Sequence, residues 1–305
     1  MRGGSLLITI FGDAIAPRGG LATLGSLIRL AAPFGLTERL VRTSVGRLAR
    51  DGWLVARRDG RRSEYRLTPQ GQQSFAQATS RLYAPGPNEW NGQWTLLLLP
   101  SAGARRTRAA NARDRLREEL RWLGFGQLNP GVFLHPGCTP EEAQEWMLAL
   151  PVQEEAVLLR SSGGAPAADR RLVEAGWDLA ELARRYRLFV AAFRPARQAL
   201  ANATADTADR LKSPVAAGSE SAFIIRTLLI HEYRKIHLQD PLLPPRLLPE
   251  HWIGASAYEL CRSLYSGLFT AAEDYLSATA STLEAALPRA GREVLTRFGG
   301  IGENG

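Results

Sequence analysis

The sequence has few cysteines and no long apolar run. Its two cysteines, Cys138 and Cys261, are too few for a disulfide framework and lack the spacing of metal ligands. Because structural disulfides belong to oxidising compartments, this shortage predicts a cytoplasmic protein. No stretch reaches the roughly 18 apolar residues that a membrane-spanning helix needs, so the sequence predicts no membrane span.

Lysine is almost absent, and arginine supplies the positive charge. The whole chain has a net charge of +8, and residues 1–83 contain 13 arginines against 5 acidic residues, which is also +8. The rest of the chain is therefore neutral. An arginine-rich proteome would explain the shortage of lysine, but it would not explain why the surplus lies in one segment. A basic segment joined to a neutral body is typical of proteins that bind a polyanion.

The first 85 residues show a pattern of helices with a β-hairpin. Apolar residues at helical spacing, together with serine and threonine caps, predict helices over 5–16, 23–32, 37–50 and 68–83. The Asp59-Gly60 pair between two short β-prone runs predicts a hairpin with strands at 53–57 and 63–67. This order is that of a winged helix-turn-helix, whose recognition helix enters the major groove of DNA.

The third predicted helix and the hairpin carry the candidate DNA contacts. An apolar stripe of Leu40, Val41, Val45 and Leu48 would face the core and leave arginines and hydroxyls exposed. Arginine can bind guanine edges in the major groove, and a basic hairpin suits the phosphate backbone or the minor groove. The side chains predicted to contact DNA are Arg39, Arg42, Thr43, Ser44, Arg47, Arg57, Arg58, Arg61 and Arg62. The alternative is a solvated surface on a winged domain that contacts other proteins.

The remainder of the chain divides into an α/β part and a helical part. Apolar runs at 94–100, 132–134 and 156–160 alternate with helical segments at 105–123 and 140–149, which indicates a small ferredoxin-like domain. From about residue 172 the pattern is helical. We therefore predict an α+β multidomain protein. Its domains are a winged helix-turn-helix at 1–85, a ferredoxin-like α/β middle domain at 90–170 and a mostly α C-terminal domain at 171–305.

Motifs along most of the chain resemble one bacterial family. The longest is the run from Arg226 to Lys235, and the shorter ones are Phe11-Gly12-Asp13, Val41-Arg42-Thr43, Asp51-Gly52-Trp53-Leu54, Gly60-Arg61-Arg62-Ser63-Glu64-Tyr65, Trp90-Asn91-Gly92-Gln93-Trp94, Leu123-Gly124-Phe125-Gly126 and Asp240-Pro241-Leu242-Leu243-Pro244. They resemble the PaaX family, the repressors of phenylacetic-acid catabolism. The resemblance implies a homodimer that binds double-stranded operator DNA and is released by phenylacetyl-coenzyme A.

The same resemblance implies an architecture. It implies a winged helix, a Cas2-like middle domain and a helical C-terminal domain for the effector and for dimerisation. From the residues alone, the middle and the C-terminal regions both remain candidates for the dimer contact.

Two basic segments are candidates for the coenzyme A effector. His231, Tyr233, Arg234 and Lys235 place polar and cationic groups on an otherwise apolar helix, and guanidinium or ammonium groups suit phosphates. Arg105 and Arg106 begin a second, arginine-rich helix. For both segments the alternative is an internal network of ion pairs, in the first case with Glu232.

An enzyme is the alternative function, with the winged domain used only for contacts. A Cas2-like fold suggests a metal-dependent nuclease, and an acyl-coenzyme A ligand suggests a thioester hydrolase. The nuclease resemblance implies an acid near the end of the first strand of the middle domain, but here that strand ends in Leu99-Pro100-Ser101. The four histidines lack metal-ligand spacing, and no nucleophile–base pair stands out. We therefore predict no enzyme, no catalytic residues, no metal and no cofactor.

Overall fold

The computed structural model divides the chain into two compact units. It describes residues 3–87, 89–99, 116–147, 156–205 and 219–301. Unit 1 combines Met1–Pro85 with Leu188–Lys235 and Ser256–Gly305, and unit 2 combines Gly86–Arg187 with Ile236–Ala255. The segment predicted as a separate C-terminal domain, 171–305, is therefore shared between the two units.

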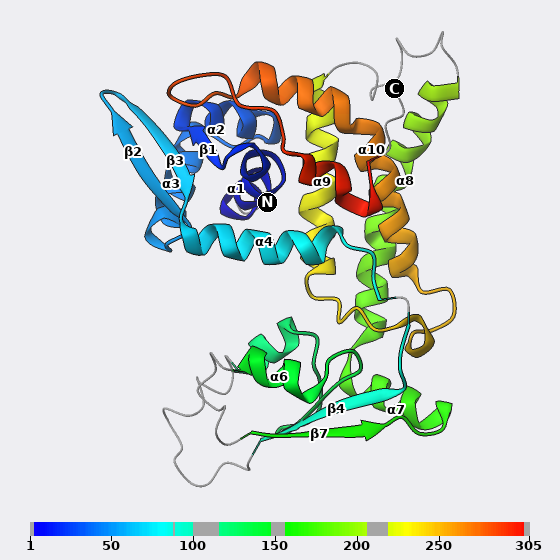
Figure 1. Cartoon of the computed structure of the whole chain (residues 1–305). Coiled ribbons are helices and arrows are strands. Elements are labelled where there is room, and N and C mark those ends of the chain that lie inside the picture. The colour runs from blue at the N-terminus through cyan, green and yellow to red at the C-terminus, as the bar shows by residue number, and fades with distance from the viewer. Residues whose placement is uncertain (1–2, 88, 100–115, 148–155, 206–218, 302–305) are drawn as a thin grey trace. The chain divides into compact units, whose positions relative to one another are not determined.

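The first part of unit 1 contains the predicted helices and hairpin (Figure 1). Helices α2 (Leu24–Ala31), α3 (Glu38–Arg50) and α4 (Pro69–Tyr83) each follow a threonine whose hydroxyl accepts a hydrogen bond from a backbone amide of the first turn. A short 3-10 turn, η3 (Ala32–Phe34), separates α2 from α3. Strands β2 (Leu54–Asp59) and β3 (Arg62–Leu67) form the hairpin, and Gly60 takes a positive φ of 54° at its turn. Local sequence signals are thus sufficient to place these elements.

The start of the chain differs from the single helix predicted over 5–16. Helix α1 (Gly3–Ile10) continues into a π-helical turn, η1 (Phe11–Ile15), and a 3-10 turn, η2 (Ala16–Arg18). Strand β1 (Leu21–Thr23) then pairs with β3, which gives an antiparallel sheet in the order β1-β3-β2. Single π-helical turns of this kind are frequent at functional sites, and η1 carries the buried Asp13.

Long helices complete unit 1. Residues from 188 onward in α8 (Leu179–Ala205) belong to it, with most of α9 (Ser219–His237) and α10 (Ile253–Thr279). The pattern predicts two helices, over 177–193 and 196–211, where the structure has one helix that continues through Pro195. Helix α10 buries Leu260, Leu264 and Leu268, one residue per turn, along its inner face.

The residues after α10 return to the N-terminal elements. We call residues 280–299, which include the 3-10 helix η6 (Arg292–Gly299), the C-terminal segment. Backbone hydrogen bonds join Thr23 N to Ser281 O at 3.1 Å and Gly291 N to Pro17 O at 2.9 Å. Within unit 1, the residues after α10 therefore complete the packing of the N-terminal elements.

Unit 2 is built on a four-stranded antiparallel sheet. Its elements are β4 (Gln93–Leu98), a helix at 116–122, β5 (Gly126–Asn129), β6 (Val132–His135), α6 (Pro140–Met147), β7 (Val157–Ser162) and α7 (Pro166–Gly176). The strand order β5-β6-β4-β7, with helices after the first and third strands, is the ferredoxin-like arrangement predicted for this region. The sequence pattern does not predict β5 or α7.

Alternate residues of the sheet face two separate cores. Leu97 and Phe133 pack with Leu120 and Met147 on the face covered by the helix at 116–122 and by α6. On the opposite face, Trp94 and Leu134 pack with Val173 of α7. Leu243 and Leu247 complete this second core, and Leu247 is the last residue of the short 3-10 helix η5 (Pro245–Leu247). The candidate effector residues Arg105 and Arg106 lie outside the described residues.

Candidate functional site

The exposed face of α3 carries four of the nine predicted DNA contacts. The exposed positions are Arg39, Arg42, Thr43 and Arg47. Arg42 Nη2 lies 2.6 Å from Glu38 Oε1, and Arg47 Nε lies 3.6 Å from Asp51 Oδ2. Because ion pairs between exposed side chains contribute little free energy, both guanidiniums can exchange these partners for a phosphate or a base edge.

Ser44 does not lie on this exposed face, contrary to the prediction. Its side chain is buried against α1, and its Oγ lies 3.3 Å from the point where a Cβ on Gly3 would stand. The buried stripe of α3 consists of Val41, Ser44, Val45 and Leu48, at the i, i+3, i+4, i+7 spacing of one helix face. Leu40, expected in that stripe, is 40% exposed. Ser44 is therefore a packing residue.

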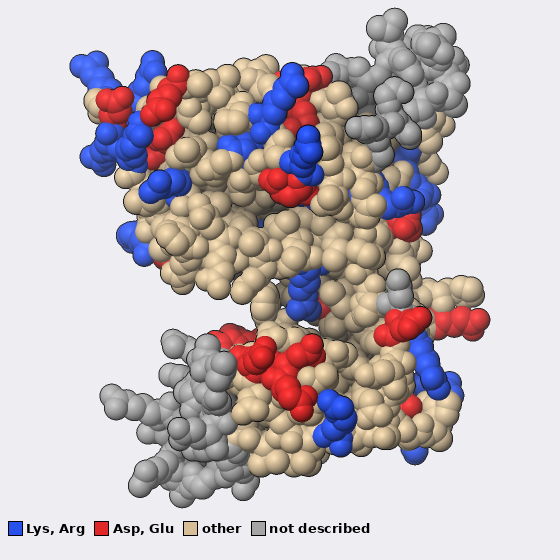
Figure 2. Space-filling view, in the orientation of Figure 1, with Lys and Arg blue, Asp and Glu red and all other residues tan. Residues whose placement is uncertain are grey.

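Four exposed arginines, Arg57, Arg58, Arg61 and Arg62, surround the turn of the hairpin, and Arg66 is exposed further along β3. Figure 2 shows basic side chains gathered at this end of the molecule, with a few acidic ones among them. Arg57 Nη2 pairs with Glu284 Oε1 of the C-terminal segment at 2.9 Å. In the part of the chain that the structure describes, no ion pair involves the other three, Arg58, Arg61 and Arg62. These three guanidiniums are available to an external anion.

The residues predicted to bind the effector on α9 instead attach this helix to α1. His231 Nδ1 lies 2.9 Å from Thr9 Oγ1, and Arg234 donates to Thr9 Oγ1 at 2.8 Å and to Ser5 O at 2.7 Å. Tyr233 is fully buried. Lys235 pairs with the neighbouring Glu232, as the ion-pair alternative expected. The prediction of an open effector site at 231–235 is therefore corrected.

The electrostatics of His231 agree with this structural role. Burial, followed by the nearby charges of Arg234 and Lys235, lowers the pKa of His231 to about 4. The ring is therefore neutral at neutral pH and supplies no positive charge for a phosphate.

A buried charged cluster surrounds Asp13, a residue for which the sequence analysis proposes no role. Asp13 Oδ1 accepts hydrogen bonds from Tyr83 Oη at 2.7 Å, Tyr265 Oη at 2.8 Å and Arg297 Nη1 at 2.8 Å. Arg226 Nε lies 3.3 Å from Asp13 Oδ2. Burial alone would raise the pKa of Asp13, but the two guanidiniums and the two phenols lower it below its usual value. The carboxylate thus joins η1, α4, α9, α10 and η6.

The cluster holds more positive than negative charge. Arg226 Nη1 also pairs with Glu273 Oε1 at 2.8 Å, and Arg18 contacts the same carboxylate and Ala14 O. Burial and the neighbouring Arg226 lower the pKa of Arg18 to about 10, which still leaves it charged at neutral pH. Three arginines therefore face two carboxylates, those of Asp13 and Glu273. Only the Phe11-Gly12-Asp13 and Arg226 motifs mark this cluster in the sequence.

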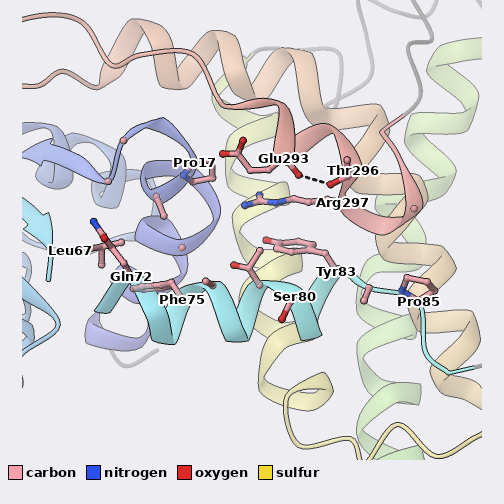
Figure 3. A pocket seen from close by; sticks show the side chains of 18 residues that line it. Pro17, Leu67, Gln72, Phe75, Ser80, Tyr83, Pro85, Glu293, Thr296 and Arg297 are labelled. Atoms are coloured by element: carbon pink, nitrogen blue, oxygen red, sulfur yellow. Dashed lines mark hydrogen bonds between the residues drawn. The ribbon is translucent and has the colours of Figure 1, made fainter. Parts of the chain in front are cut away.

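A cavity of about 750 Å³ lies beside this cluster, within unit 1 (Figure 3). Residues of η2, β3, α4 and η6 line its walls, and they include Pro17, Leu67, Phe75, Tyr83, Thr296 and Arg297. Figure 3 shows the Arg297 side chain lying over the ring of Tyr83, and the guanidinium carbon is 4.3 Å from the ring centre. This cavity is not indicated by any sequence motif.

Neither a metal-binding cluster nor a membrane-spanning helix is present among the described residues. No cluster of three or more His, Cys, Asp or Glu side chains in these residues could hold a metal ion. No helix among them is long and apolar enough to cross a membrane.

Comparisons with known proteins identify the family. Three family models match consecutive parts of the chain: the PaaX-like protein model at 2–71, the PaaX protein central Cas2-like domain at 87–173 and the PaaX-like protein C-terminal domain at 177–278. The transcriptional repressor PaaX of Escherichia coli K12 is 36% identical over 302 residues, which cover 98% of this chain and 90% of that protein. Its name describes repression of transcription and no catalysis, which agrees with the prediction that this chain is not an enzyme.

A solved structure also resembles this fold. The uncharacterized protein Rv0674 from Mycobacterium tuberculosis is 23% identical, with a TM-score of 0.49 over 82% of this chain and 89% of that one. The assignment depends on the family models and on the repressor relative, which together cover nearly the whole sequence. The chain belongs to the PaaX family of transcriptional repressors.

Proposed function

We propose that this chain represses transcription by binding operator DNA through α3 and the β2–β3 hairpin, which act as a winged helix-turn-helix. The observation that carries the proposal is the exposed arginine row on α3, opposite a buried stripe, next to a hairpin with four exposed arginines around its turn. An α-helix fits the major groove, where arginine can form two hydrogen bonds to guanine O6 and N7. The hairpin arginines then bind the phosphate backbone or the adjacent minor groove.

The regulatory part of the proposal rests on family membership. We propose that the operator controls a phenylacetate-type aromatic catabolic operon, that a homodimer binds two half-sites, and that phenylacetyl-coenzyme A releases the DNA. Half-sites read by a symmetric dimer lie about one helical turn, or a multiple of it, apart. Release requires that the effector bind the DNA-free conformation more tightly than the DNA-bound one.

Fluorescence anisotropy with a duplex from the promoter of the neighbouring gene cluster tests the DNA interface. We expect the Arg42→Ala and Arg47→Ala variants each to weaken binding by about 1–3 kcal/mol, as for the loss of a base contact. Arg170→Ala, which removes an exposed arginine on α7 in unit 2, is the matched control and should bind as the wild type does. Equal affinities in all four proteins would show that α3 does not contact DNA.

A second titration tests the effector. Phenylacetyl-coenzyme A added to the preformed complex is expected to release the duplex, whereas coenzyme A alone should not. Undiminished anisotropy at saturating thioester would contradict the proposed effector while leaving the DNA interface intact.

A further inference from the structure

The cavity between η2, α4 and η6 has the construction of a small-molecule site. Its volume of about 750 Å³ falls within the range of about 300–1,000 Å³ that is usual for ligand pockets. It is lined by Arg297, a charged side chain that is only 4% exposed. The positive charge of Arg297 therefore lies at the cavity wall and does not belong to the exposed charged surface of the protein.

Two nitrogen donors of Arg297, Nε and Nη2, lack a hydrogen-bond acceptor among the described residues. All its hydrogen bonds to described residues come from Nη1, which donates to Asp13 O, Asp13 Oδ1 and Tyr265 Oη. Its Nε and Nη2 therefore have no hydrogen-bond acceptor among the described residues. An oxygen of a ligand at this wall could therefore accept a charge-assisted hydrogen bond from either nitrogen, which is stronger than a neutral one.

The remaining walls indicate what else the ligand carries. Pro17, Leu67 and Phe75 supply apolar surface, and Figure 3 shows the ring of Tyr83 between α4 and Arg297. The exposed Glu293 also lines the cavity and disfavours a ligand of high negative charge near it. An apolar group of ring size with a single carboxylate or carbonyl oxygen satisfies both walls.

Residues that line the cavity belong to the hairpin and to the C-terminal segment that contacts it. Leu67, the last residue of β3, lines it, and so do Thr296 and Arg297 of the C-terminal segment. The same segment holds the hairpin through Leu283 N, which donates to the buried Glu64 Oε1 at 2.9 Å, and through the ion pair between Glu284 and Arg57. A ligand that displaces η6 or Leu67 therefore changes the contacts that position the hairpin.

We propose that this cavity binds an organic molecule with an apolar, ring-sized group and one carboxylate or carbonyl oxygen, and that its occupation lowers the affinity for DNA by moving the hairpin. The readout of this inference rests on the proposed function, because it uses DNA binding. The location itself is tested by ligand binding without DNA, so the two can fail separately.

The experiment measures binding of phenylacetate, phenylacetyl-coenzyme A and coenzyme A to the full chain by isothermal titration calorimetry. The Ala76→Trp variant fills the cavity from α4, and Gln77→Trp is the matched control at the next, exposed position, which does not line it. We expect wild type and Gln77→Trp to bind phenylacetate or its thioester, and Ala76→Trp to bind at least about tenfold more weakly while keeping its DNA affinity. Binding of Ala76→Trp equal to that of wild type, no binding of either phenylacetyl compound to wild type, or equal binding of coenzyme A alone would overturn the inference.

A conservative variant guards against misfolding of Ala76→Trp. Ser80→Cys places a thiol on the cavity wall, with Gln77→Cys as its control. The native Cys138 and Cys261 are buried, and burial raises the pKa of the Cys138 thiol to about 12, so the introduced thiol should react first. Saturating phenylacetyl-coenzyme A should slow alkylation of Ser80→Cys and leave Gln77→Cys unchanged, and equal rates with and without it would again overturn the inference.

Discussion

The nine side chains predicted to contact DNA differ in the interactions that they form within the protein. Arg42 pairs with Glu38 of α3, and Arg47 pairs with Asp51, the residue after that helix. Arg57 pairs with Glu284 of the C-terminal segment, and Ser44 is packed against α1. An acidic partner both occupies an arginine and repels the phosphate backbone. The acidic partners are therefore the residues whose removal should strengthen DNA binding.

Replacing Glu284 with Gln should tighten DNA binding. The change frees Arg57 and removes one negative charge next to the hairpin, so we expect the Kd for duplex DNA to fall about two- to threefold at low salt. Glu259→Gln is the control, because it removes a similar exposed ion pair, with Arg262, on α10. Anisotropy titrations would contradict this account if both variants, or neither, bound more tightly.

His231 should make the stability of the protein depend on pH. Its pKa is about 4 in the folded chain and about 6.5 when unfolded, so between these values the unfolded state binds more protons. The free energy of unfolding should thus be largest above pH 6.5 and fall by up to about 3 kcal/mol towards pH 4. Urea denaturation across this range should show a shallower pH dependence for His231→Gln, and an unchanged slope would mean that His231 is not the titrating group.

The roles of single residues were predictable only where they depend on sequence neighbours. Helical periodicity predicts the exposed arginines of α3, and the Asp59-Gly60 turn predicts those around the tip of the hairpin. His231 and Arg234 look like anion ligands in sequence, but their partners Thr9 and Ser5 lie more than 220 residues away. Ser44 shows a related limit, because a serine in an apolar stripe has the polarity of a surface residue and the position of a core residue.

At the scale of elements, the Asp13 cluster ties together five parts of unit 1. A buried ion pair adds little net stability, but removing one partner leaves the others unpaired in the core. Asp13→Asn would leave Arg18, Arg226 and Arg297 facing the single carboxylate of Glu273. We expect a loss of about 3–5 kcal/mol in the free energy of unfolding, measured by urea denaturation.

The control for this change is Asp274→Asn, an exposed acid on α10 next to Glu273. It should alter the free energy of unfolding by less than about 0.5 kcal/mol. Similar small effects of both substitutions would mean that the cluster does not hold the elements together.

Helices and strands could be predicted from the sequence where a capping residue or a turn motif marks their ends. Helices α2, α3 and α4 begin at the threonine caps that the sequence offers, and the hairpin turns at Asp59-Gly60. Strands β1 and β5 have only three and four residues, and they form because they pair with β3 and β6. A segment of three or four residues is too short to show a periodic pattern, whether its partner strand is distant, as for β1, or next in the chain, as for β5.

At the scale of the whole molecule, a compact unit does not correspond to one continuous stretch of the chain, because unit 1 is assembled from three separate stretches. The three family models match consecutive segments, whereas unit 1 combines the beginning of the chain with parts of its second half. Sequence composition marks a linker after residue 83 but carries no sign that residues 280–299 return to the N-terminal helices. The candidate DNA-binding surface therefore belongs to a unit that also contains a cavity and the end of the chain.

The most direct test of the central claim is the salt dependence of DNA affinity. If the hairpin binds phosphates, replacing Arg58, Arg61 and Arg62 together with Ala should reduce the slope of log Kd against log salt concentration by about 2 to 3. The circular dichroism spectrum should be unchanged, because these side chains are exposed and form no ion pair among the described residues. A slope equal to that of wild type, or a wild-type protein that binds no duplex at low salt, would contradict the assignment of α3 and the hairpin as the DNA-binding surface.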